Sequence, residues 1–234
     1  MQAGTNKIGE CAYCGAIGAV TRDHVPPKGL FSEPRSNDIN LITVPACQRC
    51  HNVETSMDDE YFRLALQMRE GTGDHPDAVK ARPTLMRSLE KPYKVGIRKG
   101  LLENIFPAEF FTPSGIFIKK QLALQTDMVR LRRVVQRTLN GLFYHHTNRR
   151  LPVGYDALVF NEESLQKWPA PVLDYHKKYV LKPLLDQKPF SLGNGVFSYR
   201  FRFDPTDPNT SSWFFVFYEH AWFLGLTVMP DKNI

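Results

Sequence analysis

The sequence predicts an α+β protein, in which a small metal-stabilised ββα unit is followed by a mixed α+β domain with an antiparallel sheet. Three observations predict this class. Two Cys-x-x-Cys pairs lie near the N-terminus, apolar residues recur at helical spacing from 125 to 143, and aromatic and polar residues alternate from 196 to 203. A chain of 234 residues can also bury a core without disulfides.

The composition is that of a globular protein. Apolar residues make up 42% of the chain and charged residues 23%, which excludes disordered and collagen-like classes. No window approaches the roughly 18 apolar residues of a membrane span, and the first residues lack the layout of a secretion signal. We therefore expect a cytoplasmic protein with no membrane contact.

Basic residues are concentrated in one stretch of the chain. Between 119 and 150 there are eight Lys or Arg residues and one acid, Asp127, although the net charge of the whole chain is only +6. Such an excess suits a polyanionic partner. The alternative is a helix face that is simply solvated.

The four cysteines form two pairs with none left over: Cys11 with Cys14, and Cys47 with Cys50. In a reducing compartment, two such pairs predict one structural zinc ion held by four thiolates. Redox use of a single pair is the alternative, but it leaves the second pair unexplained.

The 32 residues between Cys14 and Cys47 exceed the ~15–20 of a simple zinc ribbon, so further structure is expected there. Short strands are predicted at 19–25 and 41–44, ended by Pro26-Pro27 and by Pro45, with a helix after the second cysteine pair. Asp23 and His24 would leave a regular strand on opposite faces, so we expect the strand to bulge or end at this point.

The ordered motifs Cys-x-x-Cys, Asp-His-Val-Pro-Pro, Asn-Leu and Cys-x-x-Cys-His-Asn resemble the zinc-containing His-Asn-His (HNH) endonucleases. The resemblance covers about residues 8–70. It implies a ββα-metal nuclease domain that hydrolyses phosphodiester bonds in DNA, with a role in restriction or anti-phage defence. The chain departs from the family after His51, where Val53-Glu54-Thr55 replaces the usual lysine and following Thr or His.

The resemblance also assigns roles to residues. It implies that His24 is the general base, that Asn40 orients it, and that Asp23 and His51 bind a catalytic divalent cation. Hydrolysis of a phosphodiester needs such a base and positive charge at the phosphate. Two protein ligands leave positions open for water and phosphate, which favours Mg²⁺ or Mn²⁺.

The rest of the chain predicts a division into 1–72, a helical connecting region at 73–118, and an α+β domain at 119–234. In the helix at 125–143, Arg130, Arg133 and Arg137 lie opposite the apolar face. Together with Lys28 they are predicted to contact DNA phosphates. Strands are expected at 196–203, 213–218 and 222–228, and this domain is a possible site for a homodimer or protein partner.

Two other classes of function stay open. A zinc-stabilised module could bind nucleic acid without cutting it, or the chain could be a structural interaction protein. His145-His146 and Asp74-His75 are interpreted as a helix end and a turn.

Overall fold

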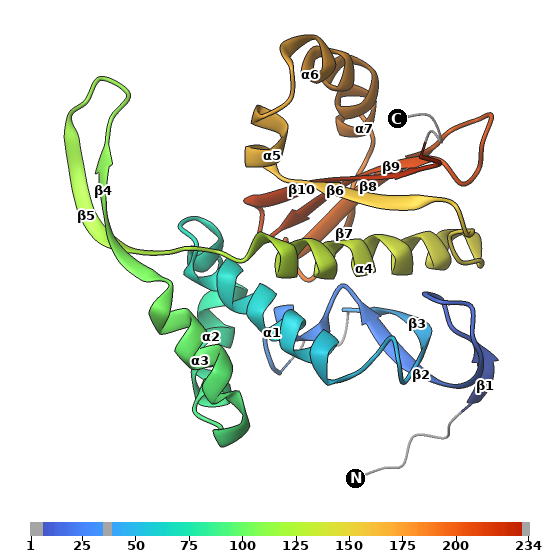
Figure 1. The fold of residues 1–234 in the computed structure, drawn as a ribbon, viewed down its shortest axis with the longest axis horizontal. Coiled ribbons are helices and arrows are strands. Elements are labelled where there is room, and N and C mark those ends of the chain that lie inside the picture. The colour runs from blue at the N-terminus through green and yellow to red at the C-terminus, as the bar shows by residue number, and fades with distance from the viewer. Residues whose placement is uncertain (1–6, 35–38, 231–234) are drawn as a thin grey trace.

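The computed structural model describes residues 7–34 and 39–230. It shows a mixed α+β fold with antiparallel sheets, as the sequence predicts. A long helix, α4 (Met128–Thr147), lies in the middle. Figure 1 shows the small N-terminal sheet and helix α1 on one side of α4 and a five-stranded sheet on the other.

The N-terminal unit contains the predicted ββα arrangement. Strands β1 (Lys7–Glu10), β2 (Ile17–Val25) and β3 (Ile42–Cys47) form an antiparallel sheet in that order, and α1 (Val53–Met68) follows. β3 continues through Pro45, which pairs with Arg22, so the prediction that Pro45 ends the strand is wrong. A proline is tolerated here because β3 lies at the edge of the sheet.

Helix α1 begins with a capping box. The Asn52 side chain accepts a hydrogen bond from the Thr55 N–H, and the Thr55 hydroxyl accepts one from the Asn52 N–H. This box satisfies two main-chain donors at the start of the helix. The second cysteine pair therefore passes directly into a well-capped helix.

The connecting region is only partly helical. Helices α2 (Pro76–Leu89) and α3 (Val95–Glu103) are followed by a hairpin of β4 (Ile105–Phe111) and β5 (Phe117–Leu124). The prediction of a helical region up to residue 118 is wrong for the hairpin. The sequence gives little sign of it, because apolar residues occur on both faces of each strand.

Helix α4 is covered on two sides, by the N-terminal unit and by the C-terminal sheet. Glycines permit its close approach to both sheets. A Cβ added at Gly141 of α4 would lie 2.5 Å from the Val25 side chain of β2, and one at Gly225 would lie 2.6 Å from Leu139. These two positions therefore require glycine for packing.

The C-terminal sheet has the strand order β6-β10-β9-β8-β7. The three strands expected from the sequence are β8 (Phe197–Phe203), β9 (Ser211–Phe217) and β10 (Ala221–Val228), and all three are confirmed. The edge strands β6 (Asp156–Phe160) and β7 (Phe190–Leu192) were not expected. Four short helical segments also lie between them: α5 (Glu162–Gln166), α6 (Ala170–His176), a π-helix (Lys177–Leu181) and α7 (Lys182–Leu185).

The larger of two hydrophobic clusters in the described residues crosses the predicted boundaries at 72 and 118. Its members include Phe62 of α1, Leu85 of α2, Leu142 of α4 and Trp213 of β9. Among the helices that the structure describes, none has the length and apolar character needed to cross a bilayer.

Candidate functional site

The four cysteines lie together, at the junction of the two cysteine turns with β2 and β3. Their sulfur atoms are all within 4.8 Å of one another, and Cys14 Sγ lies 3.7 Å from Cys47 Sγ. A tetrahedral zinc with Zn–S bonds of about 2.3 Å places its sulfurs about 3.8 Å apart. The donor set and its spacing therefore fit a single metal ion, and none of the four is in a disulfide.

Main-chain hydrogen bonds shape both cysteine turns. The Gly15 N–H donates to the Cys11 carbonyl at 2.9 Å, and the N–H groups of Cys50 and His51 both donate to the Cys47 carbonyl at 3.0 Å. A hydrogen bond from the main chain at Ala16 lowers the pKa of Cys14 to about 6. Each turn thus directs its two sulfur atoms towards the same point. The lowered pKa of Cys14 favours the thiolate form of that residue.

His51 faces Asp23 beside this cluster. His51 Nε2 lies 3.9 Å from Asp23 Oδ1. The Asp23 side chain is 7% exposed and that of His51 is 35% exposed, so the pair extends from the interior towards the surface. Because His51 follows Cys50 directly, the cysteine cluster fixes the main chain that carries this imidazole.

A hydrogen-bond chain sets the orientation of the His51 ring. The Thr21 hydroxyl lies 3.4 Å from the Ala46 carbonyl, to which it donates, and 3.4 Å from His51 Nδ1. With its proton on the Ala46 carbonyl, the hydroxyl is an acceptor for the tautomer of His51 that carries its proton on Nδ1. In the neutral imidazole the lone pair is then on Nε2, directed at Asp23.

The second oxygen of Asp23 is already occupied. Asp23 Oδ2 accepts a 2.7 Å hydrogen bond from the Tyr13 hydroxyl and lies 3.6 Å from Arg137 Nε. Burial, together with the negative charge of Asp23, raises the pKa of Tyr13 well above its usual value, so the phenol keeps its proton. These contacts hold the carboxylate so that Oδ1 points at His51.

Arg137 of α4 joins the Asp23 carboxylate to a second one. Its guanidinium also forms a close ion pair with Asp59 of α1, and its side chain is 13% exposed. Burial raises the pKa of Asp59 to about 6, although Arg137 acts in the opposite direction. A buried carboxylate and a partly buried one thus share one cation.

Replacement of Asp59 by asparagine is expected to flatten the pH dependence of stability in acid. The groups around Asp59 are Arg137, Asp23 and Asp58. The folded carboxyl binds its proton more tightly than the unfolded one, whose pKa is 3.8. The contribution of Asp59 to the free energy of unfolding is therefore complete below pH 3.8, and it is lost as the pH rises through about 6.

Urea unfolding at a series of pH values between these limits measures the effect. Across this window the free energy of unfolding of the wild type should decrease with rising pH. The decrease should be smaller in Asp59→Asn, by up to about 3 kcal/mol. Asp186→Asn, at an exposed carboxyl after α7, is the matched control. Equal slopes for wild type and Asp59→Asn would contradict the assignment.

The other predicted catalytic residues are less closely gathered. The pairing of β2 with β3 is unbroken from Val20 to Val25, so the strand has no bulge at Asp23 and His24, contrary to the expectation. His24 is half-buried and its side chain leaves β2 on the face opposite Asp23. Asn40 is exposed, just before β3.

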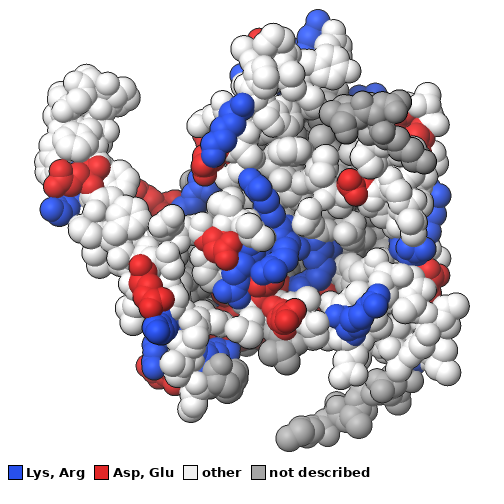
Figure 2. Space-filling view, in the orientation of Figure 1, with Lys and Arg blue, Asp and Glu red and all other residues white. Residues whose placement is uncertain are grey.

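The predicted DNA-binding residues have different surroundings. Lys28 is exposed in a short 3₁₀ turn after β2. Arg130 pairs with Asp58 at 2.7 Å and lies over the Tyr61 ring, and Arg133 pairs with Asp58 at 2.9 Å while its side chain stays 57% exposed. Figure 2 shows basic and acidic side chains intermixed on this face. Only Lys28 and Arg133 of the four present much of their charge to solvent.

Sequence reasoning did not identify Tyr13, Thr21 and Asp59 as parts of the site. Tyr13 lies in the turn between Cys11 and Cys14. Asp59 follows Asp58 near the start of α1. A signal for Asp59 exists in retrospect: two adjacent acids on α1 match the arginines of α4, but the pairing of two helices cannot be read from spacing alone.

Comparison of the chain with protein-family models, with curated proteins and with solved structures finds no match. The site is therefore interpreted on its own geometry.

Proposed function

We propose that this protein is a zinc-stabilised, metal-dependent endonuclease of the HNH type that acts on DNA. The observation that carries the proposal is the closeness of Asp23 Oδ1 and His51 Nε2, two atoms that can both bind a metal ion and lie 3.9 Å apart. A carboxylate oxygen and the lone pair of a neutral imidazole repel each other unless a metal ion or a proton lies between them. Ligands of one divalent ion, each about 2.1 Å from it, are separated by about 3–4 Å.

The surrounding residues suit this role. Thr21 binds the second nitrogen of His51, and Tyr13 and Arg137 bind the second oxygen of Asp23. Outer partners of this kind fix the orientation of metal ligands and raise the affinity for the ion. The four cysteines hold a structural zinc, which positions His51 through its neighbour Cys50.

A bound divalent cation supplies positive charge to the phosphate and to the leaving oxygen. His24 takes the proton from the attacking water, and Asn40 orients the imidazole. Because His24 leaves β2 on the face opposite Asp23, the scissile phosphate has to lie at the edge of β2 after Val20, where the described residues of β1 no longer pair with the strand. Lys28 and Arg133 contribute phosphate contacts at the exposed surface.

One observation favours a second candidate, a zinc-stabilised module that binds nucleic acid without cutting it. Asp23 is only 5% exposed and already has Arg137 as a counter-ion. A buried carboxylate with a permanent partner is also a common structural feature. In that case Asp23 and His51 would have no catalytic cation.

The two candidates differ in a plasmid assay. Zinc-loaded protein, freed of other metals, is incubated with supercoiled DNA, with and without added Mg²⁺ or Mn²⁺. Nicking that depends on the added metal supports the nuclease. Salt-sensitive binding without nicking under any of these conditions supports the module, and the absence of both leaves a structural interaction protein.

A further inference from the structure

A helical segment in the C-terminal part of the chain covers the face of the five-stranded sheet that is turned away from α4. It is called the helical cap and is defined as residues 170–188, which comprise α6, the π-helix, α7 and the turn that follows. Figure 1 shows the cap and α4 on opposite sides of this sheet. The inner side of the cap is apolar and belongs to one cluster with the sheet residues Phe214 and Trp222: Leu173, Val180, Leu181 and Leu184. The outer side is therefore the one available to a partner.

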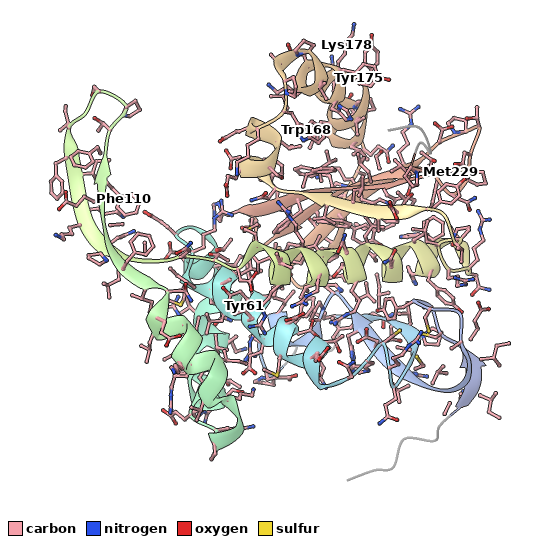
Figure 3. The ribbon with its side chains drawn as sticks, in the orientation of Figure 1. Tyr61, Phe110, Trp168, Tyr175, Lys178 and Met229 are labelled. Atoms are coloured by element: carbon pink, nitrogen blue, oxygen red, sulfur yellow. The ribbon has the colours of Figure 1, made fainter. Side chains whose placement is uncertain are left out.

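Two tyrosine rings lie together on the outer side of the cap. Tyr175 and Tyr179 are 59% and 54% exposed, and their ring centroids are 4.9 Å apart. The Lys178 ammonium lies 4.9 Å from the centroid of the Tyr179 ring. Figure 3 shows Tyr175 and Lys178 on the part of the cap that is farthest from α4. The cap thus presents aromatic rings and positive charge to solvent side by side.

Basic residues predominate around these rings. From 170 to 202 the chain has six Lys or Arg residues against two acids, Asp174 and Asp186. Arg200 of β8 adjoins the cap, because its Nε donates a 2.8 Å hydrogen bond to the Gln187 carbonyl. The six basic residues are Lys177, Lys178, Lys182 and Lys188 of the cap and Arg200 and Arg202 of β8.

Most of this positive charge is not neutralised within the chain. Lys177 lies 4.0 Å from Asp174, and both of these side chains are more than half exposed. In the described part of the chain, the other five basic residues form no ion pair. A surface with such an excess of charge attracts polyanions and repels a second copy of itself.

The chemistry of the cap favours unpaired nucleotides over other polyanionic partners. A helix that lies on a membrane inserts an apolar face, whereas the apolar side of the cap is already packed on the sheet. Duplex DNA hides the faces of its bases inside the stack, so a tyrosine ring reaches them only where bases are unpaired. Proteins that bind single strands combine basic side chains along the backbone with aromatic rings on which the bases stack.

We propose that the helical cap binds single-stranded DNA, with Tyr175 and Tyr179 stacking on unpaired bases and the basic residues at the phosphates. The π-helix carries two of the lysines and one of the tyrosines, and π turns inside helices are frequent at functional sites. The choice of DNA rests on the proposed function, and it names a single-stranded segment as part of the substrate. The cap is separate from β2, which carries Asp23, because α4 and the five-stranded sheet lie between them (Figure 1).

The test is the affinity of the full-length, zinc-loaded protein for a fluorescein-labelled oligothymidylate, measured by fluorescence anisotropy without Mg²⁺ or Mn²⁺ at several salt concentrations. Tyr175→Ser/Tyr179→Ser should raise the Kd at least about tenfold, because each stacked base contributes to binding. Lys178→Gln/Lys182→Gln should reduce the slope of log Kd against log salt by about 1.4, the value for two phosphate contacts on a single strand. All four residues are exposed, so the fold should be kept, as circular dichroism can verify.

Phe111→Ser/Phe117→Ser is the matched control and should bind like the wild type, because these rings are 53% and 54% exposed and adjoin each other on the β4–β5 hairpin. The inference is overturned by a wild type that does not bind the oligonucleotide, by a tyrosine variant with wild-type affinity, by a lysine variant with the wild-type salt slope, or by an equal loss of affinity for duplex DNA. Binding to phosphatidylserine vesicles in place of the oligonucleotide would overturn it too and assign the cap to a membrane. Oligothymidylate binding without plasmid nicking would contradict only the nuclease proposal, and nicking without oligothymidylate binding would contradict only this one.

Discussion

Substitution of Cys11 by serine is expected to abolish metal binding at the cysteine cluster and to unfold the N-terminal unit. Cys11 is fully buried, and its sulfur is one of four that fit a single ion. Structural zinc contributes on the order of 10 kcal/mol to the folding of small metal-binding units. Because α4 packs against β2, β3 and α1, this loss should also destabilise the C-terminal sheet.

The measurements are the zinc content per chain and the thermal unfolding curve. Ile17→Ser is the control, since Ile17 lies close to the cysteine turn but is 84% exposed and is not a ligand. It should retain one zinc per chain and the wild-type melting temperature. A Cys11→Ser protein with full zinc content and unchanged melting would show that the cysteine cluster does not support the fold.

Substitution of His24 by alanine is expected to reduce the rate of DNA nicking by about 10²–10⁴-fold, the usual contribution of a general base. DNA binding and the melting temperature should change little, because His24 is only half-buried. Initial rates on supercoiled plasmid at saturating Mn²⁺ measure the effect. His220→Ala, at an exposed histidine in the turn between β9 and β10, serves as the control.

Equal nicking by wild type and His24→Ala would remove His24 from the mechanism without removing the metal site. The opposite face of β2, on which His24 lies, would then be irrelevant to catalysis. A group on the Asp23 side of the strand would have to act as the base.

Local patterns predicted much of the fold. The alternation in β8 and the apolar runs of β9 and β10 reflect burial on a pleated sheet, and they were identified correctly. The β4–β5 hairpin was missed because it buries neither face, so no alternation marks it. The surroundings of α4 were also missed, since Arg130 and Arg137 look like solvent-facing residues unless the acids of α1 are placed opposite them.

The candidate site, like the fold, could be predicted from the sequence only in part. The cysteine spacing predicted a cluster, and the structure brings the four sulfurs together. The proximity of His51 and Asp23 follows from the register of β2 and β3 around that cluster. Tyr13, Asp59 and Arg137 come from three separate segments, and only tertiary packing brings them to one carboxylate.

The central claim is that Asp23 and His51 together hold one divalent cation, and Mn²⁺ binding to the zinc-loaded protein tests it most directly. Electron paramagnetic resonance of free Mn²⁺ during a titration counts the bound ions, with Asp186→Asn as the carboxylate control. We expect one site in the wild type and in Asp186→Asn, and its loss in Asp23→Asn and in His51→Ala while zinc content is kept. A wild type that binds no Mn²⁺, or an Asp23→Asn protein that binds it as the wild type does, would contradict the account.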